Sequence, residues 1–439
     1  MAQIFQFFRS AYSGIPRSIW LLCLVLFINR AGTMVLPFLA LFLTQSRGLD
    51  EGHTGAMLFA FGLGSVLGSY AGGRLSTMFG STRIMTVSLF GAGIVFPLFL
   101  QLAGLVALAF GCFIIGFVSD AFRPAMMTAV AERVTTANRT RAFALIRIAG
   151  TGGMAIGPGI GGFVAAANYD WIFMVDGLTC LGAGVLFLIL VRPSTMATAP
   201  AAKAATATSE KREVPPNSPF RDMHFMALMA LFALLFIILF QIFSTFPLYL
   251  KKDLDFSEER IGLLFTISSG VILLFEMSLV HALDGRDPLK LFGFGCFLFS
   301  LGFALLVFHD SFMWATVCIV IMTVGEMLSL PFSHTLVAER SGENSGTYMG
   351  VYTAAGSLGA LIGPPLGIYL LDQMGGFWFW LSVGSVGLVL WLGSLVLSAF
   401  WKPVEAPVAT VSSENPDGRT PDGRTPDGRT PDGPTLDSA

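Results

Sequence analysis

Long apolar runs separated by short polar stretches dominate the chain. Twelve runs reach roughly 17 to 26 residues, the helix length that crosses about 30 Å of hydrocarbon. They lack the period-two alternation of membrane barrel strands, and only helices and closed barrels satisfy their backbone in lipid. The pattern predicts an all-α membrane protein with twelve transmembrane helices, at Ile19–Leu43, Gly55–Ala71, Ile84–Leu102, Leu105–Val130, Phe143–Ala167, Trp171–Val191, Phe225–Leu250, Ile261–Leu283, Leu289–Phe308, Phe312–Val337, Tyr348–Leu371 and Phe377–Trp401.

Polar stretches between these runs mark the predicted domain boundaries. The longest, residues 193–221, is rich in Ala, Thr, Pro and charged residues and is typical of a cytoplasmic linker. It separates an N-terminal six-helix half, residues 19–192, from a C-terminal six-helix half, residues 222–402. Residues 1–18 are predicted to form a cytoplasmic segment at the membrane surface. Residues 403–439 repeat PDGRT and cannot bury a core, so they are predicted to be a disordered cytoplasmic tail.

The two halves repeat each other at an offset of 206 or 207 residues. An equal offset after an even number of spans means that the halves share one topology and are related by an axis along the membrane normal. The sequence therefore predicts two pseudo-symmetric halves that meet at an interface. The aligned features are PAMMTAVAER from Pro124 with PFSHTLVAER from Pro331, Gly55 with Gly262, and Gly157-Pro158 with Gly363-Pro364.

Composition agrees with this prediction, because 54% of residues are hydrophobic and only 12% are charged, which excludes a water-soluble globule. The 26 Lys and Arg residues are distributed unevenly once alternate loops are assigned to opposite sides of the membrane. Three lie inside spans and four on the side away from the termini, which leaves 19 on the side that carries both termini. This bias predicts that both termini lie in the cytoplasm.

The placement of the cysteines and the absence of known catalytic motifs argue against several classes of protein. All five cysteines fall within apolar runs and show no metal-ligand spacing. The sequence predicts no metal site, no cofactor and no nucleic-acid partner. It contains no Walker loop, HExxH pair or nucleophile elbow, which argues against a membrane enzyme or a non-transporting receptor.

Glycines cluster within the fifth run, in the stretch GGMAIGPGIGG. Glycines four residues apart line one helical face and let a neighbouring backbone approach closely, while a proline removes a backbone donor and bends the helix. The pattern predicts a close-packed bend on which the halves pivot; generic membrane packing is the alternative. Its members are Gly153, Gly157, Pro158, Gly161 and Gly162, and the second copy in the eleventh run has Gly359, Gly363 and Pro364 but lacks the final glycine.

Charged residues within the predicted helices are costly in lipid, and usually pair or face a wet cavity. Asp120 and Arg123 share a helical face three residues apart, and Glu326 falls within one residue of the repeat position of Asp120. The charged residues singled out deep within the spans are Arg30, Asp120, Arg123, Arg147, Asp176, Glu276 and Glu326.

We interpret Asp120 or Glu326 as the carboxylate that carries a proton, with Glu276 and Asp176 as further candidates for coupling or pairing. Burial raises the pKa of a carboxylate and an adjacent arginine lowers it, so a changing arginine contact would load and unload a proton. The three intramembrane arginines are the candidate partners for that change. A permanent salt bridge between Asp120 and Arg123 is the structural alternative.

Over about residues 17–402 the sequence resembles the major facilitator superfamily. The fifth-span glycines match its antiporter motif, and the loop GGRLSTMFGSTR resembles its loop signature, except that Thr77 and Met78 replace the usual acidic and basic residues. The stretches NRAGTMVLPFLALFLT, DAFRPAM and GEMLSLP resemble the bacterial drug-exporter branch. The resemblance implies the major facilitator fold, alternating access, and a monomer in the bacterial cytoplasmic (inner) membrane.

The resemblance also suggests gate and cavity residues. In the loop signature, Gly73, Gly80 and Arg83 match the family pattern, and Asp284 is the acid of the second-half counterpart HALDGRDPLK. Spans one, seven and ten line the cavity in this fold, so their polar residues are candidates for substrate contacts, with interhelical hydrogen bonding or packing as the alternative. These residues are Asn29, Gln241 and His334.

Together these observations predict a secondary active transporter whose partners are a small-molecule substrate, protons and the lipid bilayer. The fifth-span motif and the branch resemblance favour proton-coupled efflux of small amphipathic or drug-like compounds. The alternative is proton-coupled uptake of a small metabolite such as a sugar, a peptide or a siderophore, because the three intramembrane arginines suit an anionic substrate.

Overall fold

In the computed structural model, the described residues are 16–134, 136–190, 219–283, 285–341 and 345–401. Within them, all regular structure is helical, which confirms the predicted all-α class. The predicted N-terminal segment, linker and tail fall almost entirely outside the described residues, as does Asp284.

The N-terminal half contains seven α-helices and one π-helical turn among its described residues. They are α2 (Arg17–Ala31), α3 (Val35–Leu41), η1 (Phe42–Ser46), α4 (Glu51–Phe79), α5 (Ser81–Phe99), α6 (Leu105–Arg133), α7 (Thr136–Ala167) and α8 (Tyr169–Leu190).

The C-terminal half follows the same order. Its elements are η3 (Pro219–Arg221), α9 (Met223–Leu239), η4 (Phe240–Phe243), α10 (Thr245–Lys252), α11 (Glu258–Ala282), α12 (Pro288–Leu305), η5 (Leu306–Phe308), α13 (Phe312–Ser341) and α14 (Ser345–Phe400). Glycine is required at Gly375 inside α14, where a φ of 73° reverses the chain.

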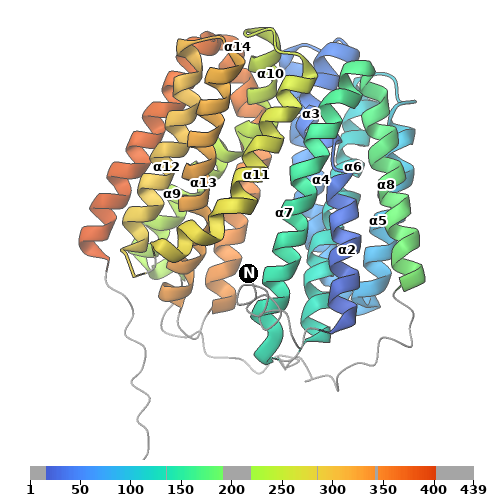
Figure 1. Ribbon diagram of the computed structural model, residues 1–439, viewed down its shortest axis with the longest axis horizontal. Helices are drawn as coiled ribbons and strands as arrows, with labels where there is room; N and C mark the ends of the chain where they lie inside the picture. The colour runs from blue at the N-terminus through green and yellow to red at the C-terminus, as the bar shows by residue number, and fades with distance from the viewer. Residues whose placement is uncertain (1–15, 135, 191–218, 284, 342–344, 402–439) are drawn as a thin grey trace, which may run out of the picture. The chain divides into compact units, whose positions relative to one another are not determined.

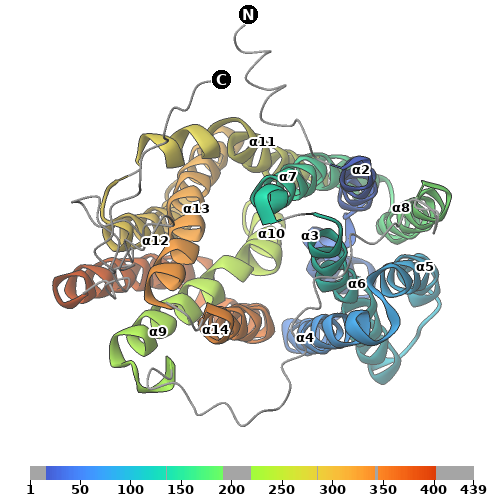
Figure 2. The same ribbon diagram turned by 90° about the horizontal axis from the view of Figure 1, so that it is seen from below.

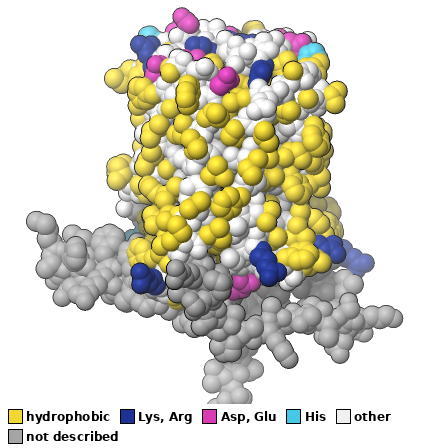
Figure 3. All heavy atoms as spheres, turned by 90° about the vertical axis from the view of Figure 1, so that its right-hand side faces the viewer, with side chains coloured by type: hydrophobic (Ala, Val, Ile, Leu, Met, Phe, Trp, Pro, Cys, Tyr) yellow, Lys and Arg dark blue, Asp and Glu magenta, His cyan; other side chains and the backbone are white. Residues whose placement is uncertain are grey.

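The described residues contain eleven helical segments long and apolar enough to cross a membrane. One of them, Thr347–Phe400, includes the turn at Gly375 and covers both the eleventh and the twelfth predicted spans. The twelve predicted spans are therefore all present as helices. Apolar side chains cover the flank shown in Figure 3 and charged side chains gather at its two ends, as expected for a surface that faces lipid.

We name the end at which α2 begins and α14 ends the base, and the opposite end the top (Figure 1). Elements α2 to α8 lie on one side of an interface, and α9 to α14 lie on the other. The halves meet along two seams, where α4 packs beside α14 and α7 packs beside α11 (Figure 2).

The two seams are built from residues that the sequence repeat pairs. Gly55 of α4 packs against Pro365 of α14, and Gly262 of α11 packs against the carbonyl of Pro158 in α7. Gly55 and Gly262 are repeat partners, and each meets the proline region of the opposite half. The predicted pseudo-symmetry is thus expressed directly in how the halves contact each other.

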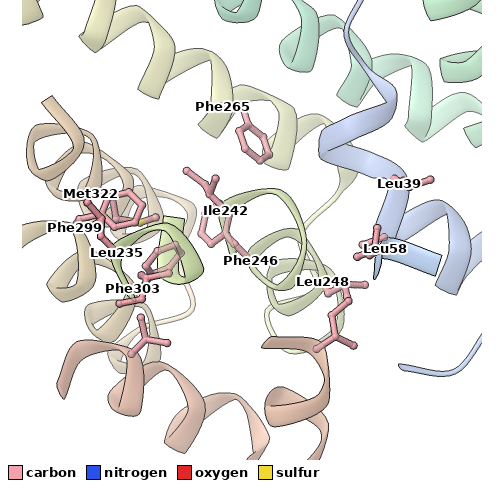
Figure 4. Packing of buried hydrophobic residues seen from close by; sticks show 14 of the residues in the cluster. Leu39, Leu58, Leu235, Ile242, Phe246, Leu248, Phe265, Phe299, Phe303 and Met322 are labelled. Atoms are coloured by element: carbon pink, nitrogen blue, oxygen red, sulfur yellow. The ribbon is translucent and has the colours of Figure 1, made fainter. Parts of the chain in front are cut away.

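Polar and apolar contacts join the halves at the top. Lys252 forms an ion pair with Glu51 at the start of α4, and the hydroxyl of Tyr169 donates a 2.6 Å hydrogen bond to Glu258 of α11. Buried leucines from both halves, including Leu39, Leu58 and Leu248, belong to one apolar cluster there (Figure 4). In this conformation the top of the interface is closed.

Spans one and seven differ from the prediction of continuous helices. Span one is interrupted between α2 and α3, and span seven passes through the 3-10 turn η4 before α10 begins. An interruption leaves backbone groups without helical partners inside the membrane, where they must be satisfied by other groups. Two candidate site residues supply those partners.

Candidate functional site

Asp176 of α8 caps the interrupted first span. One of its carboxylate oxygens accepts hydrogen bonds of 3.2 Å from the backbone amides of both Met34 and Val35, where α3 begins. The residue is 3% exposed, so this carboxylate faces backbone donors rather than open solvent. Its geometry is that of a helix-capping acceptor supplied by a neighbouring helix.

Asn29 and Gln241 each lie near one of the two interruptions, in α2 and in η4. The Asn29 amide donates to Cys180 of α8 at 3.4 Å. The buried Gln241 amide donates to the carbonyl of Gly363 at 2.7 Å, and its oxygen accepts from Thr245 at 2.5 Å. Both therefore serve in interhelical hydrogen bonding here, the structural alternative considered for these two residues.

Replacing Asp176 with Ala is expected to destabilise the protein by about 1–3 kcal/mol, because two buried backbone amides lose their acceptor. Asp176→Asn keeps an acceptor oxygen and is expected to lose less. Thermal unfolding in detergent, followed by tryptophan fluorescence, measures the difference. An Asp176→Asn variant of normal stability that no longer moves protons would instead make Asp176 a coupling residue.

Arg30 of α2 has two acidic side chains of its own half as electrostatic neighbours. It interacts electrostatically with both Asp120 and Asp176, and also with Arg123. Asp120 accepts a hydrogen bond from the hydroxyl of Ser65 in α4, a partner that the sequence did not reveal. The structure does not show the expected alternative of a salt bridge between Asp120 and Arg123: among the described residues, these two do not form an ion pair.

Glu276 of α11 connects the halves in the lower part of the second seam. Its carboxylate forms a 2.8 Å ion pair with Arg147 of α7. The Glu276 side chain is 15% exposed and that of Arg147 is 56% exposed, so the pair lies at the edge of the packed seam. Glu276 thus has the pairing role considered for it, with a partner from the opposite half.

Glu326 of α13 lies next to this pair. It is partly exposed and interacts electrostatically with Glu276, and its side chain has no hydrogen-bond partner among the described residues. When both carboxylates are ionised they repel each other, and only Glu276 is compensated by Arg147. A proton gained or lost at Glu326 would therefore change the electrostatic repulsion on Glu276, whose ion pair with Arg147 spans the interface.

His334 projects from the base half of α13 as an exposed side chain. Its ring centroid lies 4.9 Å from that of Tyr352 in α14, whose hydroxyl is 2.8 Å from the hydroxyl of Ser333. His334 also interacts electrostatically with Arg123 and Arg147 of the opposite half. Tyr352 was not among the predicted site residues, because a lone tyrosine in an apolar run gives no distinct signal.

The glycines of the fifth span pack against two different neighbours. Gly153 and Gly157 approach the backbone of α2 within their own half, whereas Gly162 approaches the backbone of Glu258 in the opposite half. Gly161 meets Met34 at the interruption of span one. In the second copy, Gly359 and Gly363 approach α9 in the same way. The motif therefore allows close packing both within a half and across the interface; a pivoting role stays a prediction.

The predicted gate loop between α4 and α5 is tied to the end of α6 by hydrogen bonds between hydroxyl groups that follow the turn and charged side chains of α6. A φ of 90° at Gly80 makes the turn. Ser81 then donates to Glu132 at 2.7 Å, and Arg133 donates to Thr82 at 3.2 Å. Gly73 packs near Pro124 and Arg83 is exposed. These contacts, rather than the charges expected of the loop signature, fasten this loop.

At the base of the C-terminal half, Asp222 precedes α9 and pairs with Arg340 of α13. The carboxylate accepts from Arg340 Nε at 2.6 Å and Nη2 at 2.9 Å, and from the Phe225 amide at 3.1 Å. Partial burial raises the pKa of Asp222, but the hydrogen bonds from Arg340 and Phe225 outweigh it and hold the pKa below the ordinary 3.8.

Asp222→Asn is expected to lower the unfolding temperature at pH 7. Because the pKa of Asp222 is depressed on folding, its contribution to stability is fully present above pH 3.8 and is lost as the pH falls through the folded-state pKa. The difference between wild type and variant should therefore shrink below that pH. Asp170→Asn, at an exposed position, is the control expected to show no such difference. A pH-independent difference would contradict the assignment.

Comparisons with known proteins agree in the kind of protein they find. A family profile described as the Major Facilitator Superfamily matches residues 22–364 and, in a second match, 290–426. The chain is 24% identical to YqjV of Bacillus subtilis (strain 168), named as an uncharacterized MFS-type transporter, over 80% of this chain and 85% of that protein. It is also 24% identical to Multidrug resistance protein 2 of the same organism, over 77% of this chain and 84% of that protein.

Solved structures share the fold at low sequence identity. A POT family transporter in complex with 5-aminolevulinic acid aligns with a TM-score of 0.72 and 17% identity, over 89% of this chain and 97% of that one. The nucleoside transporter NupG aligns with a TM-score of 0.70 and 16% identity, over 88% of this chain and all of that one. At these identities the similarity concerns the fold alone.

Proposed function

The chain belongs to the Major Facilitator Superfamily and is a membrane transporter rather than an enzyme, and we propose that it exports small amphipathic compounds in exchange for protons. The observation that carries this proposal is the arrangement of Glu326 beside Glu276, whose ion pair with Arg147 joins the two halves. Proton exchange at Glu326 changes the repulsion on Glu276 and thereby the strength of a contact between halves that must separate during alternating access.

Export is supported by the fifth-span glycine motif, which resembles that of antiporters, and by the similarity to Multidrug resistance protein 2. The same proposal places the protein in the bacterial inner membrane as a monomer, with both termini, the linker 193–221 and the tail 403–439 in the cytoplasm. The excess of Lys and Arg on the side of the termini supports this orientation.

The experiment that tests the proposal uses everted membrane vesicles that contain the protein and hold an acidic interior. An amphipathic compound added outside is expected to release protons from the interior, which a pH-sensitive dye reports. Vesicles without the protein provide the control. If the compound releases no protons here but enters right-side-out vesicles together with protons, the protein is an uptake symporter and the proposal of export is wrong.

A further inference from the structure

Arg123 of α6 differs from the other two arginines within the spans. Arg30 lies near Asp120 and Asp176, and Arg147 pairs with Glu276. Arg123 is exposed and, in the part of the chain that the structure describes, forms no ion pair with a carboxylate. A guanidinium within a transmembrane helix is costly unless it meets water or a counter-charge.

The residues near Arg123 indicate whether its side chain faces the interface or the lipid. It interacts electrostatically with His334 of α13 and Tyr352 of α14, both in the opposite half. Arg123 therefore faces the interface between the halves, the region in which a transported compound must be held, rather than lipid. Arg147 also acts on His334, so two guanidinium groups of the opposite half act on this ring.

The two residues with which Arg123 interacts, His334 and Tyr352, form an aromatic surface on the opposite half. Tyr352 is held in place because its hydroxyl bonds to Ser333 and its ring packs edge-on against Phe236 at 5.6 Å. Tyr352 is only 6% exposed, whereas His334, which lies against it, is exposed. The histidine ring is thus a supported, accessible face suited to an apolar or aromatic group.

We propose that Arg123 binds the anionic group of the transported compound and that His334, backed by Tyr352, contacts its apolar body, so that the substrates are amphipathic organic anions. A guanidinium binds a carboxylate or sulfonate through two parallel hydrogen bonds, which an ammonium cannot reproduce. The inference rests on the proposed function, because it names the class of amphipathic compound that is exported.

Two probes with the same aromatic body test this inference in the full-length protein in everted vesicles. One is the anion 8-anilino-1-naphthalenesulfonate, and the other is the neutral N-phenyl-1-naphthylamine, which lacks only the sulfonate. The anion is expected to release protons with saturable kinetics. Arg123→Gln should raise its half-saturating concentration about tenfold or more and change the maximal rate far less, because a charge-assisted contact is lost from the bound state.

Matched variants separate recognition from folding. Arg123→Lys keeps the charge and should recover part of the affinity, while Arg221→Gln removes an exposed arginine outside the spans and should behave as wild type. His334→Ala should weaken binding of the anion by roughly three- to tenfold through its apolar body. Size-exclusion profiles establish that each variant is folded.

The outcomes distinguish this inference from the proposed function. If the neutral amine drives proton release and the sulfonate does not, export holds and the anionic substrate class is wrong. If Arg123→Gln handles the sulfonate as wild type does, Arg123 is not the recognition residue and the inference fails. If neither probe releases protons, the proposed exchange of amphipathic compounds for protons fails as well.

Discussion

Replacing Glu326 with Gln is expected to abolish substrate-driven proton movement while leaving substrate exchange across the membrane intact. Glutamine has nearly the shape of a protonated glutamate but cannot release a proton. Because Glu326 has no hydrogen-bond partner among the described side chains, the change removes a titratable group without breaking a structural contact. The fold and the substrate contacts should therefore survive, and only the coupling to protons should be lost.

Two assays on the same proteoliposomes separate these effects. A pH-sensitive dye inside the vesicles reports proton movement, and counterflow of labelled substrate reports exchange that needs no net proton transfer. Glu339→Gln makes the same chemical change at an exposed position of the same helix and is expected to retain both activities. Normal proton movement in Glu326→Gln would remove this residue from the coupling mechanism and leave Asp120 as the next candidate.

If Glu326 carries the proton as proposed, coupling is expected to depend on Arg147 as well. Glu276 is the shared neighbour of both, since it pairs with Arg147 and repels Glu326 when both carboxylates are charged. The three residues come from α13, α11 and α7, so a local change of charge acts on the seam between the halves. In the proposed mechanism, this connection would let a single proton change the stability of the closed interface.

Most of the fold follows from the sequence because membrane helices are long and their repeats are regular. The repeat aligns Gly55 with Gly262, and in the structure each lies at one of the two seams, since helices that approach closely in lipid need small residues at their contact. The interruptions of spans one and seven do not follow from the sequence. Small or polar residues do occur at both breaks, at Gly32 and Thr33 and at Gln241, Ser244 and Thr245. They are too few to lower the hydropathy of a whole span, and hydropathy records contact with lipid rather than the continuity of backbone hydrogen bonds.

The candidate site is predicted less completely than the fold. Sequence position gives the approximate depth of a charged residue in the membrane, because each helical residue adds about 1.5 Å. It does not give the partner, which depends on how helices rotate against each other. Arg147 meets Glu276 across the interface, and Asp176 meets the backbone of Met34 and Val35. The partners in both contacts are far apart in the sequence, so neither contact could be predicted from it.

Replacing Gly262 with Ala is expected to damage transport severely, whereas the same change at its repeat partner Gly55 should be tolerated. A Cβ at Gly262 would lie 2.5 Å from the carbonyl oxygen of Pro158 and 3.0 Å from the Cα of Gly162, and neither backbone atom can move without shifting α7. At Gly55 the nearest atom, the Cα of Pro365, would be 3.5 Å away, an ordinary contact. The repeat pairs the two glycines, yet only one seam is packed too tightly for a methyl group.

The expected size of the effect follows from overpacking, which costs about 1–3 kcal/mol. Imposed on the conformation that is closed at the top, this cost shifts the equilibrium toward opening by roughly 5- to 150-fold. Leu39 is fully buried in the closed top, so a Leu39→Cys thiol should react faster with a polar reagent when Gly262→Ala is present. The five native cysteines are all buried, and the chain that contains only these gives the background rate. Equal labelling of the Gly55→Ala and Gly262→Ala chains would contradict the view that the seam between α7 and α11 is the tighter of the two.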